Sequence, residues 1–82
     1  MTEEEIKKII FMLLKQIAPD TDPEQLHPDD NIRQKLDIDS FDALRLIVEL
    51  DEKFGVATPE QDYGKISTLQ KLVAYIKEKK SG

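Results

Sequence analysis

The sequence predicts an all-α fold: a four-helix bundle with three long helices, one short helix and a long loop between helices one and two. Apolar residues recur at three- and four-residue spacing in three separate segments of the chain, which is the period of amphipathic helices. No segment alternates apolar and polar residues for long, so β-strands are not expected. A chain of 82 residues builds only one hydrophobic core, so we expect residues 1–82 to form a single domain.

The first long helix is expected to begin after Thr2 and to end before Pro19. Thr2 and Glu5 have the spacing of a capping box. Met12 lies in the apolar body of this segment and is expected to fill the core. The helical stripe consists of Ile6, Ile9, Ile10, Leu13, Leu14 and Ile17.

A long loop is expected over residues 19–39, which hold three of the four prolines and show no helical period. Loops of this length in small domains are usually functional or contain a short turn of helix. Four apolar side chains could pin the loop to the core: Leu26, Ile32, Leu36 and Ile38.

The second long helix is expected from Ser40 to Phe54, with Gly55 ending it in the left-handed conformation. Thr58 then reads as the cap of a short third helix with Pro59 at its first position. The last long helix is expected to open on a second capping box, formed by Ser67 and Gln70. Its apolar stripe is Leu69, Leu72, Val73 and Ile76.

Composition excludes several classes of protein. Without cysteine and with His27 as its one histidine, the chain has no disulfide scaffold and no zinc site. A net charge of −5 repels nucleic acid and anionic lipid and favours partners with Lys or Arg patches. The acidic N-terminus does not resemble a signal peptide, and the run Ile9–Leu14 is too short to span a bilayer. We therefore expect a cytoplasmic monomer without stable membrane insertion.

The acidic residues are concentrated before the second helix. Residues 20–42 hold eight Asp or Glu against two basic residues, whereas residues 71–80 hold four lysines against one glutamate. Asp20, Asp22 and Glu24 have the first spacings of a calcium-binding EF-hand loop, but Gln25 and Asn31 replace its required Gly and Glu. No metal site is therefore predicted, and at most weak binding of divalent cations to the acidic surface near Ser40 is expected.

Ser40 is the strongest candidate for a functional residue. It lies where the loop meets the second helix, and the first turn of a helix stabilises an anion such as a phosphate esterified to the hydroxyl. Ser and Asp are also favoured helix caps whatever the function, so plain capping by Asp39 or Ser40 remains an alternative. Because nothing places His27 near Ser40 as a general base, no catalytic residues are predicted.

The second helix carries apolar residues on two opposite faces. At about 100° per residue, Ala43, Leu46, Ile47, Leu50 and Phe54 form a complete core-facing stripe. Phe41, Leu44 and Val48 form a second cluster on the opposite side, with Arg45, Glu49 and Glu52 on one margin and Asp51 on the other. An apolar strip with charged margins is typical of a docking site, unless the domain packs around this helix more fully.

Two segments resemble the acyl carrier protein family: Leu36–Asp42, which reads LDIDSFD, and Tyr63–Leu69, which reads YGKISTL. The resemblance spans most of the chain and implies a carrier without catalytic activity. It implies that a separate phosphopantetheinyl transferase attaches 4′-phosphopantetheine from coenzyme A to Ser40, with Asp39 helping the transferase and its metal. The arm would hold acyl intermediates as thioesters and present them to acyl-loading and acyl-processing enzymes of fatty acid, lipid or polyketide biosynthesis.

The resemblance also assigns surfaces to the second helix and the core. The resemblance places Phe41, Asp42, Leu44, Val48 and Glu52 on the partner-facing side, which is the outer face found from the helical period. With Arg45 and Glu49 from the margin of that face, they make up the predicted partner surface. In this family a long acyl chain can withdraw between the helices. Candidates for lining such a pocket are Leu50, Phe54, Ile66 and Leu72, and each also fits plain core.

The chain departs from the family pattern at several positions. Asp37 stands where the family usually has Gly, so we expect a turn that does not need the left-handed backbone. Phe41 replaces the usual Leu, and Arg45 and Lys53 replace acidic residues. The reversed charge predicts a specialised carrier serving a restricted set of enzymes. An aminoacyl or peptidyl carrier and an unmodified helical interaction module remain alternatives.

Overall fold

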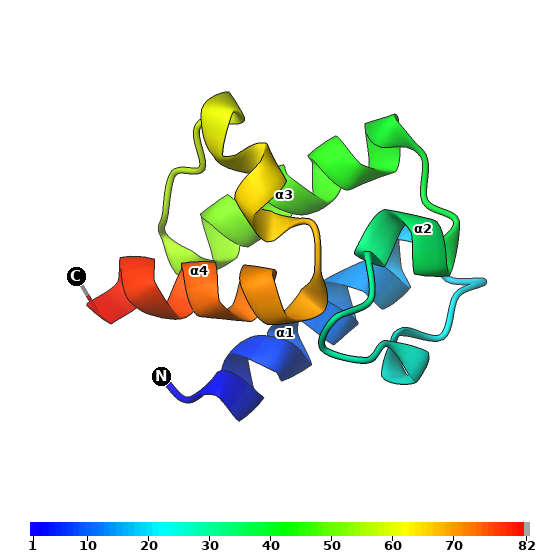
Figure 1. Cartoon of the computed structure of the whole chain (residues 1–82), viewed down its shortest axis with the longest axis horizontal. Helices are drawn as coiled ribbons and strands as arrows, with labels where there is room; N and C mark the ends of the chain where they lie inside the picture. The colour runs from blue at the N-terminus through cyan, green and yellow to red at the C-terminus, as the bar shows by residue number, and fades with distance from the viewer. Residues whose placement is uncertain (82) are drawn as a thin grey trace.

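The computed structural model describes residues 1–81 and confirms an all-α bundle (Figure 1). Two long helices have 15 residues each and the third has 13. The elements in chain order are α1 (Glu3–Ile17), the 3₁₀ helix η1 (Pro23–Gln25), α2 (Ile32–Leu36), α3 (Ser40–Phe54), the 3₁₀ helix η2 (Glu60–Ile66) and α4 (Leu69–Ser81). Within the described residues, no helix is both long enough and apolar enough to cross a membrane.

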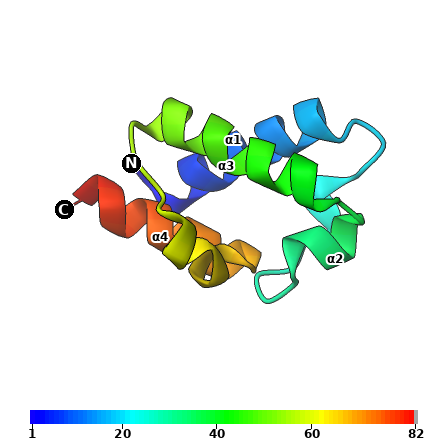
Figure 2. The same cartoon turned by 90° about the horizontal axis from the view of Figure 1, so that it is seen from above.

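The helix α1 forms the base of the fold and contacts both α3 and α4 (Figures 1 and 2). The 3₁₀ helix η2 packs on α4, and η1 packs on α1. The side chains of Ile6, Ile10 and Leu14 are fully buried in a core that also takes side chains from α2, α3, η2 and α4 and from the connecting residues Leu26 and Ile38. The core prediction for Met12 is wrong, because its side chain is 41% exposed on the outer side of α1.

The predicted capping box of α1 is present. The backbone N–H of Glu5 donates to Thr2 Oγ1 at 3.2 Å, and the backbone N–H of Thr2 donates to Glu5 Oε1 at 3.0 Å. Two N–H groups at the start of the chain are thereby paired, and the helix begins where the sequence predicted.

The long loop contains the short turn of helix that its length suggested, and in fact two such turns. Asp22 caps η1, and Asn31 caps α2 through a 3.0 Å hydrogen bond from the backbone N–H of Gln34. The backbone N–H of Ile32 donates to the Ser67 carbonyl at 3.0 Å, which ties the start of α2 to the residues before α4. The four apolar residues expected to pin the loop are all buried: Leu26, Ile32, Leu36 and Ile38.

Two predicted helix caps are wrong. Thr68, rather than Ser67, caps α4 by accepting the backbone N–H of Lys71 at 3.1 Å. Ser67 has a helical backbone that ends η2, whereas a capping residue needs an extended one. Thr58 does not cap the third helix, because its hydroxyl donates to Asp51 Oδ1 at 2.7 Å. Pro59 takes the capping position of η2 instead.

Candidate functional site

The turn before α3 is held in a left-handed conformation at Asp37. Its backbone has φ of 53° and ψ of 48°, and the N–H groups of Asp37 and Ile38 both donate to the Arg33 carbonyl. This double hydrogen bond is the usual way of ending a helix, with the left-handed residue directly after it. The prediction that Asp37 removes the need for a left-handed backbone is therefore wrong: the chain keeps the conformation and places an L-residue in it.

Asp39 caps α3, which leaves the Ser40 hydroxyl available. The backbone of Asp39 is extended, and its Oδ1 accepts the N–H of Asp42 at 2.8 Å. Ser40 is the first residue of α3 and is exposed. Within residues 1–81 its hydroxyl makes no hydrogen bond. The sequence allowed either residue to be the cap of α3, and in the structure the cap is Asp39.

An apolar cavity of about 420 Å³ opens beside Ser40. This volume is within the range of about 300–1,000 Å³ that is typical of small-ligand pockets. Its walls come from α2, α3, η2 and α4, and η2 packs on α4. The lining residues are Asn31, Ile32, Arg33, Ser40, Ala43, Leu44, Leu46, Ile47, Leu50, Tyr63, Ile66, Ser67 and Leu72.

Three of the four residues predicted for an acyl pocket line this cavity: Leu50, Ile66 and Leu72. The fourth, Phe54, is 2% exposed and lies in the core outside the lining. A second and much smaller cavity, of about 10 Å³, shares Ile47 and the same three lining residues. The structure therefore places apolar space directly behind the position of Ser40.

The outer face of α3 exposes the apolar strip, defined as Phe41, Leu44 and Val48. Their side chains are 75%, 47% and 50% exposed. Arg45 and Glu52 beside the strip are exposed, and Asp42 and Glu49 are half-buried. Asp51 does not form the opposite margin, because both of its carboxylate oxygens accept hydrogen bonds from Thr58.

A polar brace holds η2 on α4 next to the cavity wall. The Tyr75 hydroxyl donates to Asp62 Oδ2 at 2.8 Å, and Lys65 Nζ lies 3.3 Å from Asp62 Oδ1. The hydrogen bond from Tyr75 is the main cause that lowers the pKa of Asp62, and Lys65 lowers it further. Burial, followed by the hydrogen bond to Asp62, raises the pKa of Tyr75. The brace therefore favours an ionised carboxylate facing a neutral phenol.

Comparison with known proteins decides the family. A family model described as "Phosphopantetheine attachment site" matches residues 9–76. The chain is 35% identical over 80 residues to an acyl carrier protein of Chlorobium phaeobacteroides, covering 96% of this chain and 100% of the relative. It is 38% identical over 78 residues to an acyl carrier protein of Lactobacillus johnsonii, covering 94% and 95% of the two chains. The chain belongs to the acyl carrier protein family.

The fold of this acyl carrier agrees with a solved relative. A solution structure from Anaplasma phagocytophilum, assigned as an acyl carrier protein, matches with a TM-score of 0.83 at 27% identity. The match covers 96% of this chain and 92% of the relative. The carrier transports acyl intermediates on a 4′-phosphopantetheine prosthetic group and is not an enzyme. It interacts with a phosphopantetheinyl transferase and with acyl-processing enzymes.

The residues of this acyl carrier fit the prosthetic group. An exposed and unpaired hydroxyl at the start of α3 can be esterified without breaking a contact within the described residues. The adjacent cavity has apolar walls and a polar edge formed by Asn31, Arg33, Tyr63 and Ser67. Residues 1–81 contain no group of three or more His, Asp or Glu side chains arranged to hold a metal ion.

The polar edge of the cavity was not predicted from the sequence. Asn31 and Arg33 fell in the long loop expected over residues 19–39, and Tyr63 was noted only in the segment that resembles the family. Their shared position depends on α2, whose five residues are too few to show a helical period. The one available signal was Asn31 three residues before Gln34, which is the spacing of the cap that the structure contains.

Proposed function

We propose that Ser40 carries the 4′-phosphopantetheine arm of this acyl carrier. The observation that supports the proposal is its position: Ser40 is the exposed first residue of α3, Asp39 has already capped the helix, and the residue borders the apolar cavity. A phosphate ester at this point is stabilised by the N-terminal end of α3. Once attached, the group supplies a thiol that holds acyl cargo as a thioester.

The test is the intact mass of the protein after incubation with coenzyme A, magnesium and a broad-specificity phosphopantetheinyl transferase. We expect a gain of one phosphopantetheine unit in the wild type and none in Ser40→Ala. Ser67→Ala is the matched control, because Ser67 borders the same cavity but lies before α4. A gain in Ser40→Ala, or no gain in the wild type, would reject Ser40 as the attachment point.

The cavity is proposed to receive the acyl chain. Its walls at Leu50, Ile66 and Leu72 are apolar, and it borders Ser40, from which an attached chain would reach it. Transfer of each methylene from water into such space is favourable by about 0.8 kcal/mol. Acyl cargo of the fatty acid, lipid or polyketide type fits this lining.

The outer face of α3 is proposed to dock the enzymes that this carrier serves. The apolar strip supplies a buried contact, and Asp42, Glu49 and Glu52 supply negative charge around it. Arg45 is exposed within this face, so a partner that presents only basic residues would meet a like charge there. We therefore propose a restricted set of partner enzymes with a mixed-charge docking patch.

The cytoplasmic location expected from the sequence also stays a prediction.

Binding of a general fatty-acid ketosynthase tests the restriction. We expect it to bind the wild-type carrier weakly and to bind Arg45→Glu about tenfold more tightly, which corresponds to about 1.4 kcal/mol, because the substitution removes a like-charge contact. Lys35→Glu has the same change of charge on α2 and is the matched control. Wild-type binding as tight as that of a general fatty-acid carrier would contradict a restricted partner set.

A further inference from the structure

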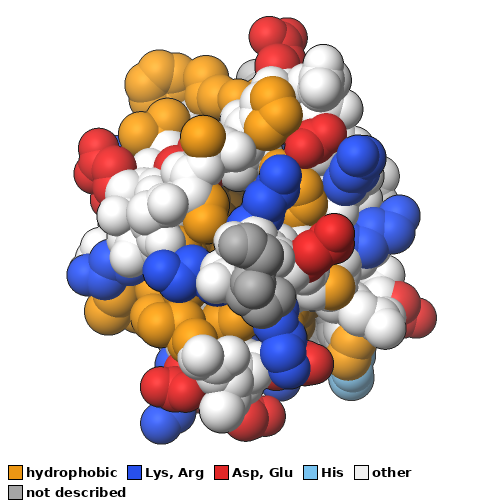
Figure 3. Space-filling model, turned by 90° about the vertical axis from the view of Figure 1, so that its left-hand side faces the viewer, with side chains coloured by type: hydrophobic (Ala, Val, Ile, Leu, Met, Phe, Trp, Pro, Cys, Tyr) orange, Lys and Arg blue, Asp and Glu red, His pale blue; other side chains and the backbone are white. Residues whose placement is uncertain are grey.

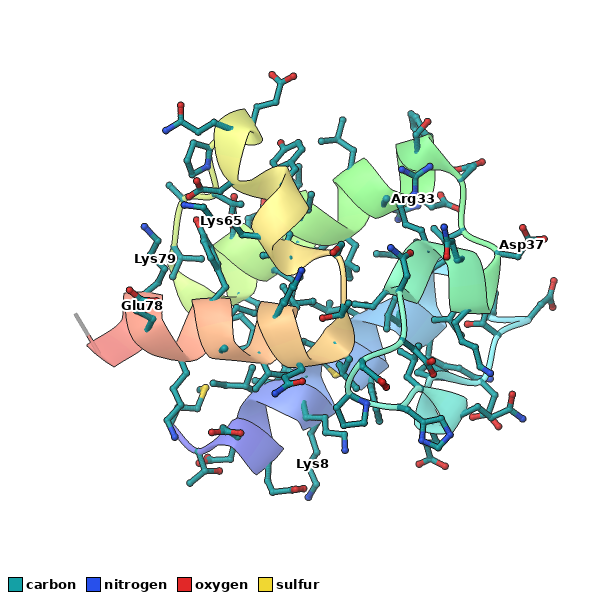
Figure 4. All side chains as sticks on the ribbon, viewed as in Figure 1. Lys8, Arg33, Asp37, Lys65, Glu78 and Lys79 are labelled. Atoms are coloured by element: carbon teal, nitrogen blue, oxygen red, sulfur yellow. The ribbon has the colours of Figure 1, made fainter. Side chains whose placement is uncertain are left out.

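A cationic side chain borders the same cavity as Ser40. Among the described residues that line the cavity, Arg33 is the only one with a charge. It belongs to α2 and is exposed, and it was not part of the predicted site. Figure 4 shows its side chain extending from α2 toward the first turns of α3, whereas Asp37 points away from the molecule.

Arg33 is also tied to the turn that leads into α3. Its Nε donates to the carbonyl oxygen of Ile38 at 3.5 Å. Ile38 and Ser40 are two residues apart, so their Cα atoms are separated by at most about 7 Å. The hydrogen bond occupies Nε and leaves the terminal nitrogens of the guanidinium outside this contact. Those nitrogens are within reach of a group attached to the Ser40 hydroxyl.

The base of this side chain is rigid. Asn31 caps α2, and the neighbouring Ile32 is 4% exposed and bonded through its N–H to the Ser67 carbonyl at 3.0 Å. Arg33 therefore starts from a fixed point on the cavity edge. A guanidinium held in this way loses less side-chain entropy when it binds an anion.

The residues next to Ser40 in the sequence carry negative charge that a guanidinium can offset. Asp37, Asp39 and Asp42 all lie within three residues of Ser40, and a phosphodiester on Ser40 adds another negative charge to them. Like charges this close repel one another, most strongly at low ionic strength. Arg33 can offset this repulsion and can hold two phosphate oxygens with parallel N–H groups, as arginine does in phosphate sites.

We propose that Arg33 binds the phosphodiester of the arm attached to Ser40 and directs the arm toward the cavity mouth. The inference rests on the proposed attachment at Ser40. It makes Arg33 a positioning residue: the guanidinium holds the anionic root of the arm, so the remainder of the arm starts at the edge of the apolar space. An isolated Lys or Arg on the same helix but outside the cavity edge lacks this position.

The test uses four proteins, each with the 4′-phosphopantetheine arm attached: the wild type, Arg33→Gln, Arg33→Lys and the control Lys35→Gln. Lys35 lies on α2, is exposed and does not line the cavity, so its substitution matches the change of charge. Intact mass establishes attachment in each protein, and thermal unfolding followed by circular dichroism establishes that each is folded. The readouts are the ³¹P chemical shift of the arm and the Arg33 Nε–H signal in a ¹H–¹⁵N spectrum.

We expect attachment to shift the Arg33 Nε–H signal. The ³¹P signal should be displaced in Arg33→Gln, partly restored in Arg33→Lys and unchanged in Lys35→Gln, and the displacement should shrink as salt is added. An attached arm with the same ³¹P shift in all four proteins, and an unmoved Nε–H signal, would overturn the inference while leaving attachment at Ser40 intact. Lack of attachment in the wild type would overturn both.

Discussion

Asp37 holds the turn into α3 in a backbone conformation that is unfavourable for an L-residue. The left-handed region costs most L-residues about 1–2 kcal/mol, and Asp tolerates it better than most. The conformation is kept because the N–H groups of Asp37 and Ile38 both pair with the Arg33 carbonyl. Position 37 therefore sets the path of the chain to Ser40 and does so under strain.

Replacing Asp37 by Gly is expected to stabilise the fold. Asp37→Gly should raise the free energy of unfolding by about 0.5 kcal/mol, because relief of the left-handed strain exceeds the extra freedom gained by the unfolded chain. Asp37→Ala should lower it by about 1 kcal/mol. Thermal unfolding followed by circular dichroism measures both, with Asp37→Asn showing the effect of charge alone. A less stable Asp37→Gly would mean that the aspartate side chain contributes something beyond its backbone.

Asp39 caps α3 in the structure, and it is also proposed to help the transferase and its metal. Asp39→Ala should lower the free energy of unfolding by about 1 kcal/mol, because it removes the cap of α3. Asp39→Asn should keep that stability, because Asn caps a helix as well as Asp. If the charge helps the transferase and its metal, Asp39→Asn should still be modified about tenfold more slowly or worse in a mass-spectrometric time course. Asp29→Asn, at an exposed position outside the docking face, controls for charge, and equal rates for Asp39→Asn and the wild type would remove Asp39 from that function.

At the scale of elements, η2 determines the size of the cavity. It packs on α4 and is braced there by Tyr75 and Asp62, so the space between η2 and α3 stays open at about 420 Å³. A run of seven residues is long for a 3₁₀ helix. Its position depends on the brace as well as on the burial of Ile66.

The brace should give stability a distinct pH dependence. The pKa of Asp62 is lowered in the folded protein, so its contribution is present above the unfolded value near pH 4 and is lost as pH falls through the folded pKa. Tyr75→Phe should therefore lower the melting temperature at neutral pH, and its difference from the wild type should shrink below about pH 4. The raised pKa of Tyr75 contributes stability that is lost as pH rises through the folded value, so the variant should also lack this alkaline loss.

Tyr63→Phe is the control for the pH series. Tyr63 belongs to η2 and borders the cavity, but within the described residues its hydroxyl has no aspartate partner. Its melting temperature should follow that of the wild type at every pH. A Tyr75→Phe difference that stays constant from neutral to acidic pH would show that packing, and not the hydrogen bond to Asp62, links η2 to α4.

Filling the cavity should abolish its response to acyl length. Ala43 lines the cavity from α3 and is half-buried. In the wild type, acyl chains of increasing length should raise the free energy of unfolding by up to about 0.8 kcal/mol per methylene until the space is full. Ala43→Phe should flatten this series, and Ala74→Phe, at an exposed position of α4 outside the cavity, should not. A wild-type melting temperature that does not depend on acyl length would contradict chain burial.

The parts of the fold that were predicted are those with strong local signals. The boundaries of α3 follow from Asp39 and Gly55, and its two faces follow from the helical period over 15 residues. The polar edge of the cavity could not be predicted, because Arg33 reaches it through the contact of Ile32 with Ser67, a pairing between distant parts of the chain. The two wrong caps have a similar cause. Ser67 ends the neighbouring helix η2, and the Thr58 hydroxyl donates to Asp51 in α3.

At the scale of the whole molecule, charge is unevenly distributed. The segment of residues 20–42 holds eight acidic residues, whereas residues 71–80 hold four lysines against one glutamate. Figure 3 shows Lys and Arg side chains on the face of the molecule where α4 ends. The molecule measures 34 × 25 × 21 Å. At about 0.01 M salt the screening length of about 30 Å is comparable with these dimensions, so the carboxylates repel one another across the whole fold.

Raising the ionic strength should therefore stabilise the carrier. From about 0.01 M to about 0.15 M salt the screening length falls to about 8 Å. We expect the relief to amount to about 1 kcal/mol, which raises the melting temperature of a chain of this size by about 4–8 °C. The double variant Asp20→Asn with Asp29→Asn removes two exposed carboxylates of the acidic segment and should reduce the salt effect. Lys80→Gln, at the basic end, should enlarge it. A melting temperature independent of salt in all three proteins would mean that the carboxylates of residues 20–42 do not repel one another measurably in the folded protein. Arg33 would then have no carboxylate repulsion to offset.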